Sequence, residues 1–124
     1  MTAARKRAYV VFDVEHDADV VDLLVTQSRN PDSPFEVVDR STGDPEAARA
    51  RIRAADVAVV LCGEYTGTDE GVNAELRILQ EEAIPYFLLR GRFEIWAKPE
   101  AARPTEKTYG WTWPHLKTLI GGGR

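Results

Sequence analysis

The sequence contains very little cysteine, since Cys62 is the only one in 124 residues. A single thiol cannot form an intramolecular disulfide, and it does not supply the cluster of thiolates that holds a structural zinc ion. We therefore expect a cytoplasmic protein, in a reducing compartment, without a metal site. Long hydrophobic runs are missing as well, because the longest, 57–62, is far shorter than the roughly 20 apolar residues that cross a bilayer. The sequence thus predicts no membrane-spanning segment and no membrane partner.

The net charge is small, at −4, but the charges are unevenly distributed along the chain. Residues 1–89 hold nine basic and 17 acidic side chains, whereas residues 90–124 hold seven basic and three acidic ones, together with all three tryptophans. An acidic protein disfavours general nucleic-acid binding, although this basic, aromatic-rich C-terminal segment can bind phosphate groups by ion pairing and stacking. The length and the 44% of hydrophobic residues predict one globular domain over residues 1–124.

Four short apolar runs alternate with helical patterns along the first 89 residues. The runs are rich in β-branched and aromatic residues, as in strands buried on both faces, and cover 9–12, 35–38, 57–62 and 86–89. The helical patterns extend from Asp17 to before Asn30, from Asp44 to about Ala55 and from Val72 to before Pro85. This series predicts an α/β fold with a flavodoxin-like parallel sheet of order 2-1-3-4 and helices on both faces. A closing helix is expected over 113–120, whereas 90–112 shows no recognisable pattern.

The carboxyl ends of the strands are the expected ligand site, because ligands of open α/β sheets bind where the strand order reverses. In the order 2-1-3-4 this crevice lies between the first and third strands. The residues expected to line it are Asp13, Glu15, His16, Gly63, Glu64, Tyr65 and Thr66. Tyr65 offers a ring that can stack on a base. The glycines of the loop 63–68 are expected to serve turns, since the loop lacks the lysine and the spacing of a phosphate-binding motif.

Glu75 is the strongest candidate for a catalytic group. It lies three residues after Val72 and four before Leu79, at the rim of the apolar stripe of its helix and beside the predicted crevice. A partly desolvated carboxylate there can hold ribose hydroxyls or stabilise the positive charge that develops at an anomeric carbon. The alternative is that Glu75, in the first turn of the helix, only complements the helix dipole.

Two further sets of candidates have simpler structural explanations. Glu15, His16 and Asp17 are metal-ligand types, but three adjacent residues of a turn cannot all face one ion. A solvated loop with Asp17 as a helix cap is expected instead. Cys62 together with His16 suggests a thiol nucleophile, yet a cysteine at the end of a buried strand usually acts as a small hydrophobe.

The basic segment after the fourth strand offers candidates for phosphate binding. Arg90 and Arg92 follow this strand directly and are expected near its carboxyl end, where an arginine can pair with a pyrophosphate. For the remainder of the segment, we expect the aromatic side chains to close the edge of the sheet and the cations to be solvated.

Several motifs resemble those of the TIR-like family of small bacterial proteins, which includes the signal-generating TIR proteins of Thoeris antiphage defence. The run 9–13 is similar to the opening strand of that family, and Asp19 stands at its recurrent acidic position. The similarity continues through 52–61 with the following Tyr65 and Thr66, through 72–76, where TIR domains have their glutamate, and through the aromatic closing motif 109–113. Together these motifs span nearly the whole chain.

The resemblance implies a TIR-like domain that cleaves the bond between nicotinamide and ribose in NAD and releases an ADP-ribose signal. NAD is then the substrate, no further cofactor is expected, and Glu75 is the catalytic glutamate. The implied partners are a nucleotide and either a second copy of the chain or an effector protein, and the implied substrate contacts are Asp13, Glu15, Tyr65, Thr66 and Arg90. Two alternatives stay open: a TIR-like assembly module without activity, and an enzyme similar to nucleoside deoxyribosyltransferases, which share the sheet and a glutamate nucleophile.

Overall fold

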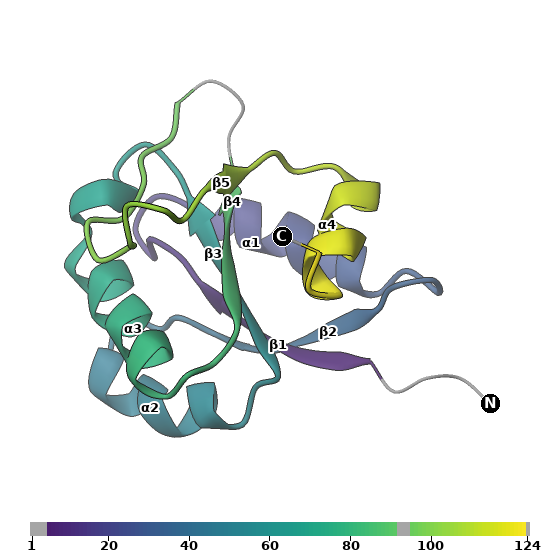
Figure 1. Ribbon diagram of the computed structural model, residues 1–124, viewed down its shortest axis with the longest axis horizontal. Helices are drawn as coiled ribbons and strands as arrows, with labels where there is room; N and C mark the ends of the chain where they lie inside the picture. Colours follow the sequence, from purple (N-terminus) through teal and green to yellow (C-terminus); the bar gives the residue numbers. More distant parts are fainter. Residues whose placement is uncertain (1–4, 92–94, 124) are drawn as a thin grey trace.

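The protein is built around one parallel β-sheet. A computed structural model describes residues 5–91 and 95–123, and the strands of these residues follow the order β2-β1-β3-β4-β5. Their bounds are β1 Lys6–Val11, β2 Phe35–Arg40, β3 Val57–Cys62, β4 Tyr86–Arg90 and β5 Thr108–Tyr109. Each neighbouring pair runs parallel. The predicted α/β, flavodoxin-like sheet of order 2-1-3-4 is confirmed, with β5 added at its edge (Figure 1).

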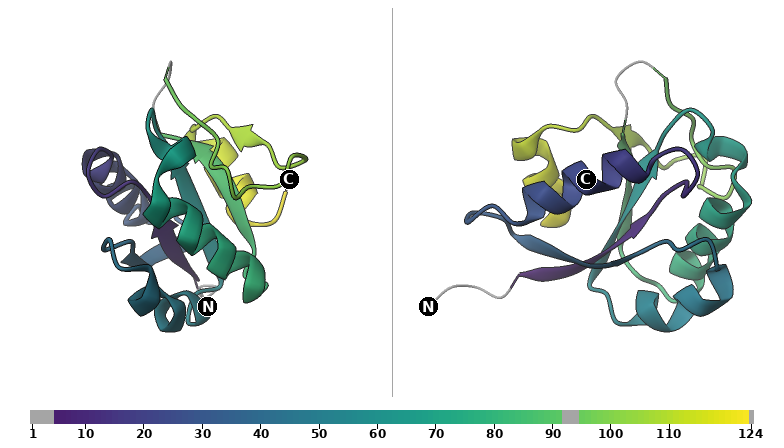
Figure 2. Two further views of the ribbon diagram at one scale, coloured as in Figure 1. Left: turned by 90° about the vertical axis from the view of Figure 1, so that its left-hand side faces the viewer. Right: turned by 180° about the vertical axis from the view of Figure 1, so that it is seen from behind.

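Helices cover both faces of the sheet. Their bounds are α1 Ala18–Ser28, α2 Pro45–Arg53, α3 Glu70–Glu81 and α4 Trp113–Ile120, with a single 3-10 turn, η1, at Thr66–Thr68. Helices α2 and α3 lie on one side of the sheet and α1 and α4 on the other, as Figure 1 and the view from behind in Figure 2 both show. Among the residues described, no helix is long and apolar enough to span a bilayer.

Each face of the sheet has its own hydrophobic core. All of β3 is buried, and its side chains alternate between the two faces, with Val59 and Leu61 on the side of α1 and Val60 and Cys62 on the side of α3. Because both faces are covered, the central strands have no need of polar residues, which is why uninterrupted apolar runs predicted them.

Side-chain caps explain where two helices begin. Asp44 accepts a hydrogen bond from the backbone N–H of Glu46 at 3.2 Å, which confirms the predicted start of α2. Asp69 accepts one from the N–H of Val72 at 2.8 Å. Helix α3 therefore begins at Glu70, two residues earlier than the apolar periodicity indicates.

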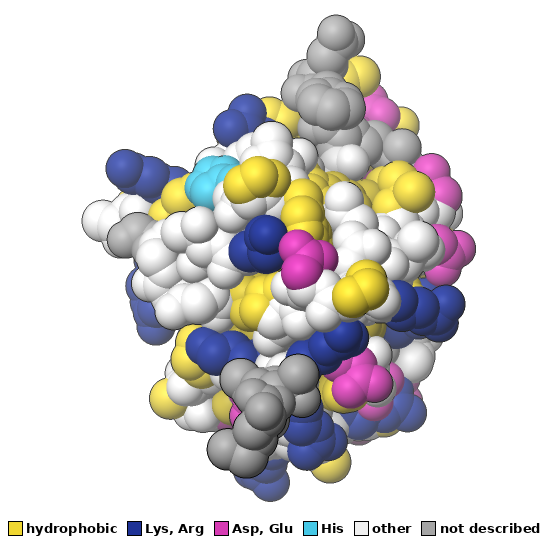
Figure 3. Space-filling model, turned by 90° about the vertical axis from the view of Figure 1, so that its right-hand side faces the viewer, with side chains coloured by type: hydrophobic (Ala, Val, Ile, Leu, Met, Phe, Trp, Pro, Cys, Tyr) yellow, Lys and Arg dark blue, Asp and Glu magenta, His cyan; other side chains and the backbone are white. Residues whose placement is uncertain are grey.

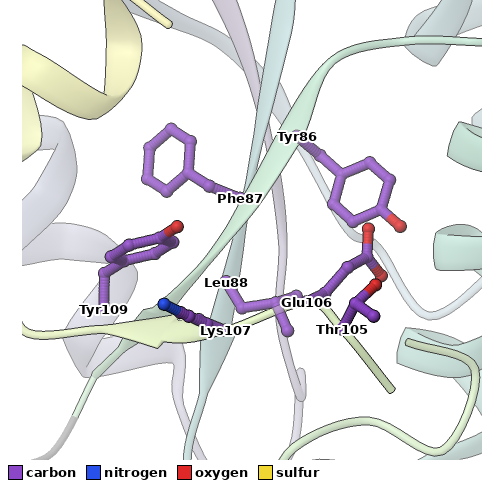
Figure 4. A pocket seen from close by; sticks show the side chains of 7 residues that line it. All are labelled: Tyr86, Phe87, Leu88, Thr105, Glu106, Lys107 and Tyr109. Atoms are coloured by element: carbon purple, nitrogen blue, oxygen red, sulfur yellow. The ribbon is translucent and has the colours of Figure 1, made fainter. Parts of the chain in front are cut away.

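The strand β5 lies in the segment 90–112, for which the sequence shows no pattern. It is only two residues long and pairs with the second half of β4, opposite Leu88 and Leu89. Tyr86, at the start of β4, is thus not paired with β5, and it lines a hollow of about 340 Å³. Figure 4 shows Tyr86 and Glu106 together on one side of this hollow. Burial and the neighbouring Glu106 carboxylate raise the pKa of Tyr86 to about 12. A short edge strand beside charged side chains is a poor template for pairing with another chain.

Candidate functional site

Glu75 lies inside the protein, at the point where three separate elements meet. Its side chain is only 1% exposed and extends from α3 toward β1. The Tyr9 hydroxyl on β1 donates a hydrogen bond to Glu75 Oε1 at 2.5 Å, and the Ser41 hydroxyl, directly after β2, donates a second at 3.0 Å. Because α3 begins at Glu70, Glu75 stands in its second turn, so the alternative of a first-turn residue facing the helix dipole does not describe its position.

Burial determines the ionisation of this carboxylate. Loss of contact with water raises the pKa of Glu75, and the negative charge of Asp69 adds to this, whereas the hydrogen bonds from Tyr9 and Ser41 and the charge of Arg51 oppose it. The pKa of the Tyr9 hydroxyl is raised as well, first by burial and then by its bond to Glu75. Glu75 is thus a desolvated carboxylate held in one orientation, which is a common feature of catalytic carboxyl groups.

A second cluster surrounds the carboxyl end of β1. The Asp13 carboxylate is 1% exposed, accepts the backbone N–H of Glu15 at 3.0 Å and lies 2.7 Å from Nδ1 of His16. This contact raises the pKa of His16, which favours the charged imidazolium. The His16 ring lies 4.4 Å, centroid to centroid, from that of Tyr65. The structure therefore brings Asp13, His16 and Tyr65 together, as the predicted crevice requires.

Asp69 links the two clusters. It caps α3, and burial and the nearby Asp13 raise its pKa, while its own charge raises the pKa of Glu75. Asp69 thus interacts electrostatically with both Asp13 and Glu75 near the carboxyl edge of the sheet. An anionic substrate would meet repulsion here unless a cation or a buried proton offsets it.

Other predicted contacts face elsewhere or serve the fold. Thr66 is fully buried, and its hydroxyl accepts the N–H of Gly63 at 2.7 Å, so it holds the turn after β3. Glu15 and Glu64 are exposed, and Tyr65 is 53% exposed. Among the predicted lining residues, Tyr65 is thus the one whose ring a solvent-borne ligand can reach most readily.

Arg90 lies apart from Glu75. It lines a pocket with residues of α1, on the opposite side of the sheet from α3, and its guanidinium carbon lies 5.3 Å from the centre of the Trp96 ring. Arg90 is the last residue of β4, so it lies at the carboxyl end of this strand as predicted, but its side chain lines this pocket and no contact places it beside Glu75. Arg92, the second arginine expected at this strand end, lies outside the described residues.

Several other cations and aromatics of the C-terminal segment have partners within the fold. Tyr109, Trp111 and Trp113 pack against the core under α1 and α4, which agrees with the expected closure of the sheet edge. The Lys117 ammonium pairs with Asp32 at 3.1 Å. Figure 3, which views the molecule from the side of α4, shows basic side chains interspersed with acidic and hydrophobic ones rather than gathered in one patch of the described surface.

Asp17 occupies the N-cap position of α1, but its side chain makes no capping hydrogen bond to the described first turn, which corrects the predicted cap. Its carboxylate instead lies against Gly63, where a Cβ atom would come within 2.3 Å of Oδ2. The φ angle of Gly63 is not positive, so this glycine is needed for close approach rather than for a turn.

The thiol and metal alternatives gain no support from the geometry. Cys62 is fully buried, and burial raises the pKa of its thiol to about 12, far from that of a nucleophile at neutral pH. Within residues 5–91 and 95–123, no three His, Cys, Asp or Glu side chains are grouped as a metal site would need. In the candidate metal-ligand motif 15–17, the His16 ring contacts the Asp13 carboxylate instead.

Tyr9 and Ser41 belong to the site but were not predicted from the sequence pattern. Tyr9 lies within an apolar strand, where a tyrosine hydroxyl must find a buried partner, and that requirement was an available signal. Ser41 directly follows β2, at the same carboxyl edge as Asp13. Both residues hold Glu75 in place, so they are positioning residues for its carboxylate.

Replacing Tyr9 with phenylalanine is expected to destabilise the protein by about 2 kcal/mol at neutral pH, because the buried carboxylate loses a donor. The Tyr9 hydrogen bond lowers the pKa of Glu75, so its loss penalises the ionised form most. The cost should therefore shrink as the pH falls through the folded-state pKa of Glu75, which lies above 4.5, and should be smallest near pH 4, where Glu75 is largely protonated in the folded protein with or without the Tyr9 hydroxyl. Urea denaturation of both proteins from pH 4 to pH 8 measures this difference.

Tyr65→Phe is the matched control for this measurement. It removes the same hydroxyl and keeps the aromatic ring, but at an exposed position. It is expected to change the free energy of unfolding by less than about 0.5 kcal/mol at any of these pH values. A Tyr9→Phe cost that is the same at pH 4 and pH 8 would contradict the role given to the Tyr9 hydroxyl.

Comparison with known proteins adds no family assignment. No model of a known protein family matches the chain, and no curated protein matches it. The buried Glu75 and the coupled acids at the carboxyl edge of the sheet are therefore the principal structural support for a function.

Proposed function

We propose that the protein cleaves the N-glycosidic bond between nicotinamide and ribose in NAD, with Glu75 as the catalytic carboxylate, and that it releases an ADP-ribose signal in antiphage defence. The observation that carries the proposal is the burial and fixed orientation of Glu75 by Tyr9 on β1 and Ser41 directly after β2, in a sheet whose strand order reverses next to β1. The motif resemblance to TIR-like proteins supports NAD as the substrate.

The reaction needs little from the protein beyond one well-placed negative charge. Nicotinamide leaves as a neutral base and takes the electron pair of the C–N bond, so positive charge develops at the anomeric carbon. A desolvated carboxylate beside that carbon stabilises this charge more strongly than water does. Water then adds to the anomeric carbon and releases one proton, which gives ADP-ribose, or a hydroxyl or ring nitrogen of the same molecule adds to give a cyclised product.

The residues around Glu75 suggest how the substrate is held. Tyr65 is the exposed ring at the same edge and can stack on a base. Asp13 fixes His16 at 2.7 Å, and the resulting imidazolium can offset part of the repulsion between the local acids and a pyrophosphate. Glu15, which is exposed beside them, remains a proposed contact for sugar hydroxyls.

Glu75 is 1% exposed, so catalysis requires part of its cover to move. The turn 42–44 is the segment suited to this motion, because its residues are exposed and directly follow Ser41, which bonds Glu75. Gly43 in this turn has a φ of 90°, a conformation that other residues adopt with strain. Opening of this turn would expose the carboxylate to a ribose without disturbing the sheet.

The test is to incubate the purified protein with NAD and to follow free nicotinamide and ADP-ribose products by chromatography. Glu75→Gln is the loss-of-function variant, and Glu81→Gln is its matched control, since Glu81 is an exposed residue at the far end of the same helix. Release of nicotinamide that depends on Glu75 and not on Glu81 supports the proposal. Release that is equal in the wild type and in Glu75→Gln would end it.

The rate of NAD cleavage is expected to rise with pH through the pKa of Glu75. Burial holds this pKa above its ordinary value of 4.5, and the ionised form is the one that stabilises positive charge. The acidic limb of the profile should therefore lie above pH 4.5. A kcat that is constant from pH 4 to pH 8, measured on folded protein, would contradict this assignment.

Two other functions are separated by the same assay. Burial of Glu75 with two hydrogen bonds on Oε1 also suits an assembly module without activity, which would leave NAD intact at every pH and protein concentration. A tyrosine hydroxyl that orients a glutamate also suits a nucleophile that attacks deoxyribose. Base exchange on a deoxynucleoside, with NAD unchanged, would favour this second reaction.

A further inference from the structure

A separate pocket of about 460 Å³ lies on the side of the sheet opposite Glu75. Leu23 and Gln27 of α1 form one wall, Trp111 forms another, and Arg90 stands at the end of β4. Two glycines, at positions 91 and 110, also line it. Its size falls within the range of small-molecule sites.

Arg90 and Gln27 supply hydrogen-bond donors among the described residues that line this pocket. Nε of Arg90 is buried and has no hydrogen-bond acceptor among the described residues. Gln27 uses its amide oxygen to accept the indole N–H of Trp111 at 2.7 Å, so its NH₂ group is the part left to donate. Nη2 of Arg90 lies beside Gly110, another lining residue, so the outer end of the guanidinium is the part placed to meet an acceptor of a ligand.

None of the described residues that line the pocket is acidic. The hydroxyls of Thr26 and Thr112 are already engaged, one donating to the carbonyl of Asp22 and the other accepting from the backbone N–H of His115. The rest of the wall is apolar, with Leu23 left 63% exposed at the rim and the indole of Trp111 beside it. The pocket thus combines one cationic end with a wall suited to a flat ring.

We propose that this pocket binds a small organic anion that carries a planar aromatic ring. The carboxylate or phosphate of the ligand accepts hydrogen bonds from Arg90 and from the Gln27 amide, and its ring lies against Trp111 and Leu23. This binding site is independent of the proposed activity at Glu75, because the two lie on opposite faces of the sheet.

The test is a titration monitored by ¹H–¹⁵N NMR of the tryptophan indoles. Four probe compounds distinguish the contribution of a negative charge from that of an aromatic ring. AMP and 2-naphthoate have both features, adenosine has only the ring, and inorganic phosphate has only the charge. At least one of the two aromatic anions should shift the Trp111 indole signal saturably, at least tenfold more tightly than adenosine or phosphate. The indole of Trp113, which donates to Asp32 at 3.2 Å outside the pocket, serves as the internal reference. Binding of AMP indicates a phosphate ligand, whereas binding of 2-naphthoate indicates a carboxylate ligand.

Gln27→Glu is the decisive variant. A glutamate still accepts the indole N–H of Trp111, but it replaces the amide donor with a negative charge, so aromatic-anion binding should weaken at least tenfold. Ala50→Glu adds the same charge at an exposed position of α2 and should bind as the wild type does. Glu75→Gln should also bind unchanged, which separates this pocket from the proposed NAD site. Failure of both aromatic anions to bind, equal binding of adenosine, or full binding by Gln27→Glu would each overturn the proposal.

Discussion

Replacing Glu75 with glutamine is expected to reduce the release of nicotinamide from NAD by about 10²–10³-fold, the usual cost of removing one group that stabilises charge in a transition state. The variant keeps the shape of the side chain, and its amide oxygen can still accept the hydrogen bonds from Tyr9 and Ser41. What it loses is the negative charge beside the anomeric carbon. The assay described above, on wild-type and variant protein at equal concentration, measures the effect.

The same variant is expected to be more stable than the wild type at neutral pH. The pKa of Glu75 is raised in the folded protein, so the folded state binds its proton more readily than the unfolded state does. The stability of the wild type must therefore fall as the pH rises from the unfolded value of 4.5 through the folded pKa. Glutamine does not ionise, so the variant does not lose this stability as the pH rises. The Tm of Glu75→Gln should therefore exceed that of the wild type at pH 8 and approach it at pH 4.

These two readouts distinguish a catalytic from a structural role. Loss of activity together with a gain in stability is the pattern of a residue kept for function at a cost to the fold. Loss of stability at pH 8 would instead mean that the fold needs the carboxylate itself. Glu81→Gln removes an exposed carboxylate that pairs with Arg49 at 2.7 Å, and such a surface pair contributes little, so this control should change neither activity nor Tm appreciably.

Most of the fold could be predicted from the sequence because the determining signals are local. The run 57–62 coincides with β3 residue for residue, and the Asp44–Pro45 start of α2 rests on capping chemistry that neighbouring residues supply. The strand β5 could not be predicted, since its two residues carry no periodicity and it exists through its pairing with β4. Its place in the sheet depends on tertiary structure alone.

The candidate site shows the same division between local and distant information. The position of Glu75 on its helix followed from the apolar stripe, but its burial depends on Tyr9, which is 66 residues away in the chain. The position of Arg90 directly after β4 suggested a partner at the crevice. Its side chain instead lines the pocket on the α1 side of the sheet, and its guanidinium carbon lies 5.3 Å from the centre of the Trp96 ring. Sequence position fixes where a long side chain starts but not where its charged end lies.

Gly63→Ala is expected to give the largest loss of stability among the variants considered, about 3 kcal/mol. Gly63 follows β3 at the carboxyl edge, and an added Cβ would lie 2.3 Å and 2.6 Å from the two carboxylate oxygens of Asp17. That carboxylate is 2% exposed and short, so it cannot swing into solvent as a long side chain would. The backbone on both sides of Gly63 is also fixed, because its N–H bonds Thr66 and its carbonyl accepts the N–H of Ala97 at 2.9 Å. Urea denaturation at pH 7 measures the cost.

A double-mutant cycle identifies the cause of that loss. If the clash with Asp17 is responsible, Gly63→Ala should cost much less in a protein that already carries Asp17→Ala, and the two changes should be strongly non-additive. Gly121→Ala is the matched control, since a Cβ at that position meets its nearest neighbours at 3.5 Å or more and should be tolerated. Additive effects of Gly63→Ala and Asp17→Ala would mean that the close approach of α1 to β3 does not require a glycine. Non-additivity would instead establish that the first turn of α1 and the end of β3 are packed as one unit beside the coupled acids of the candidate site.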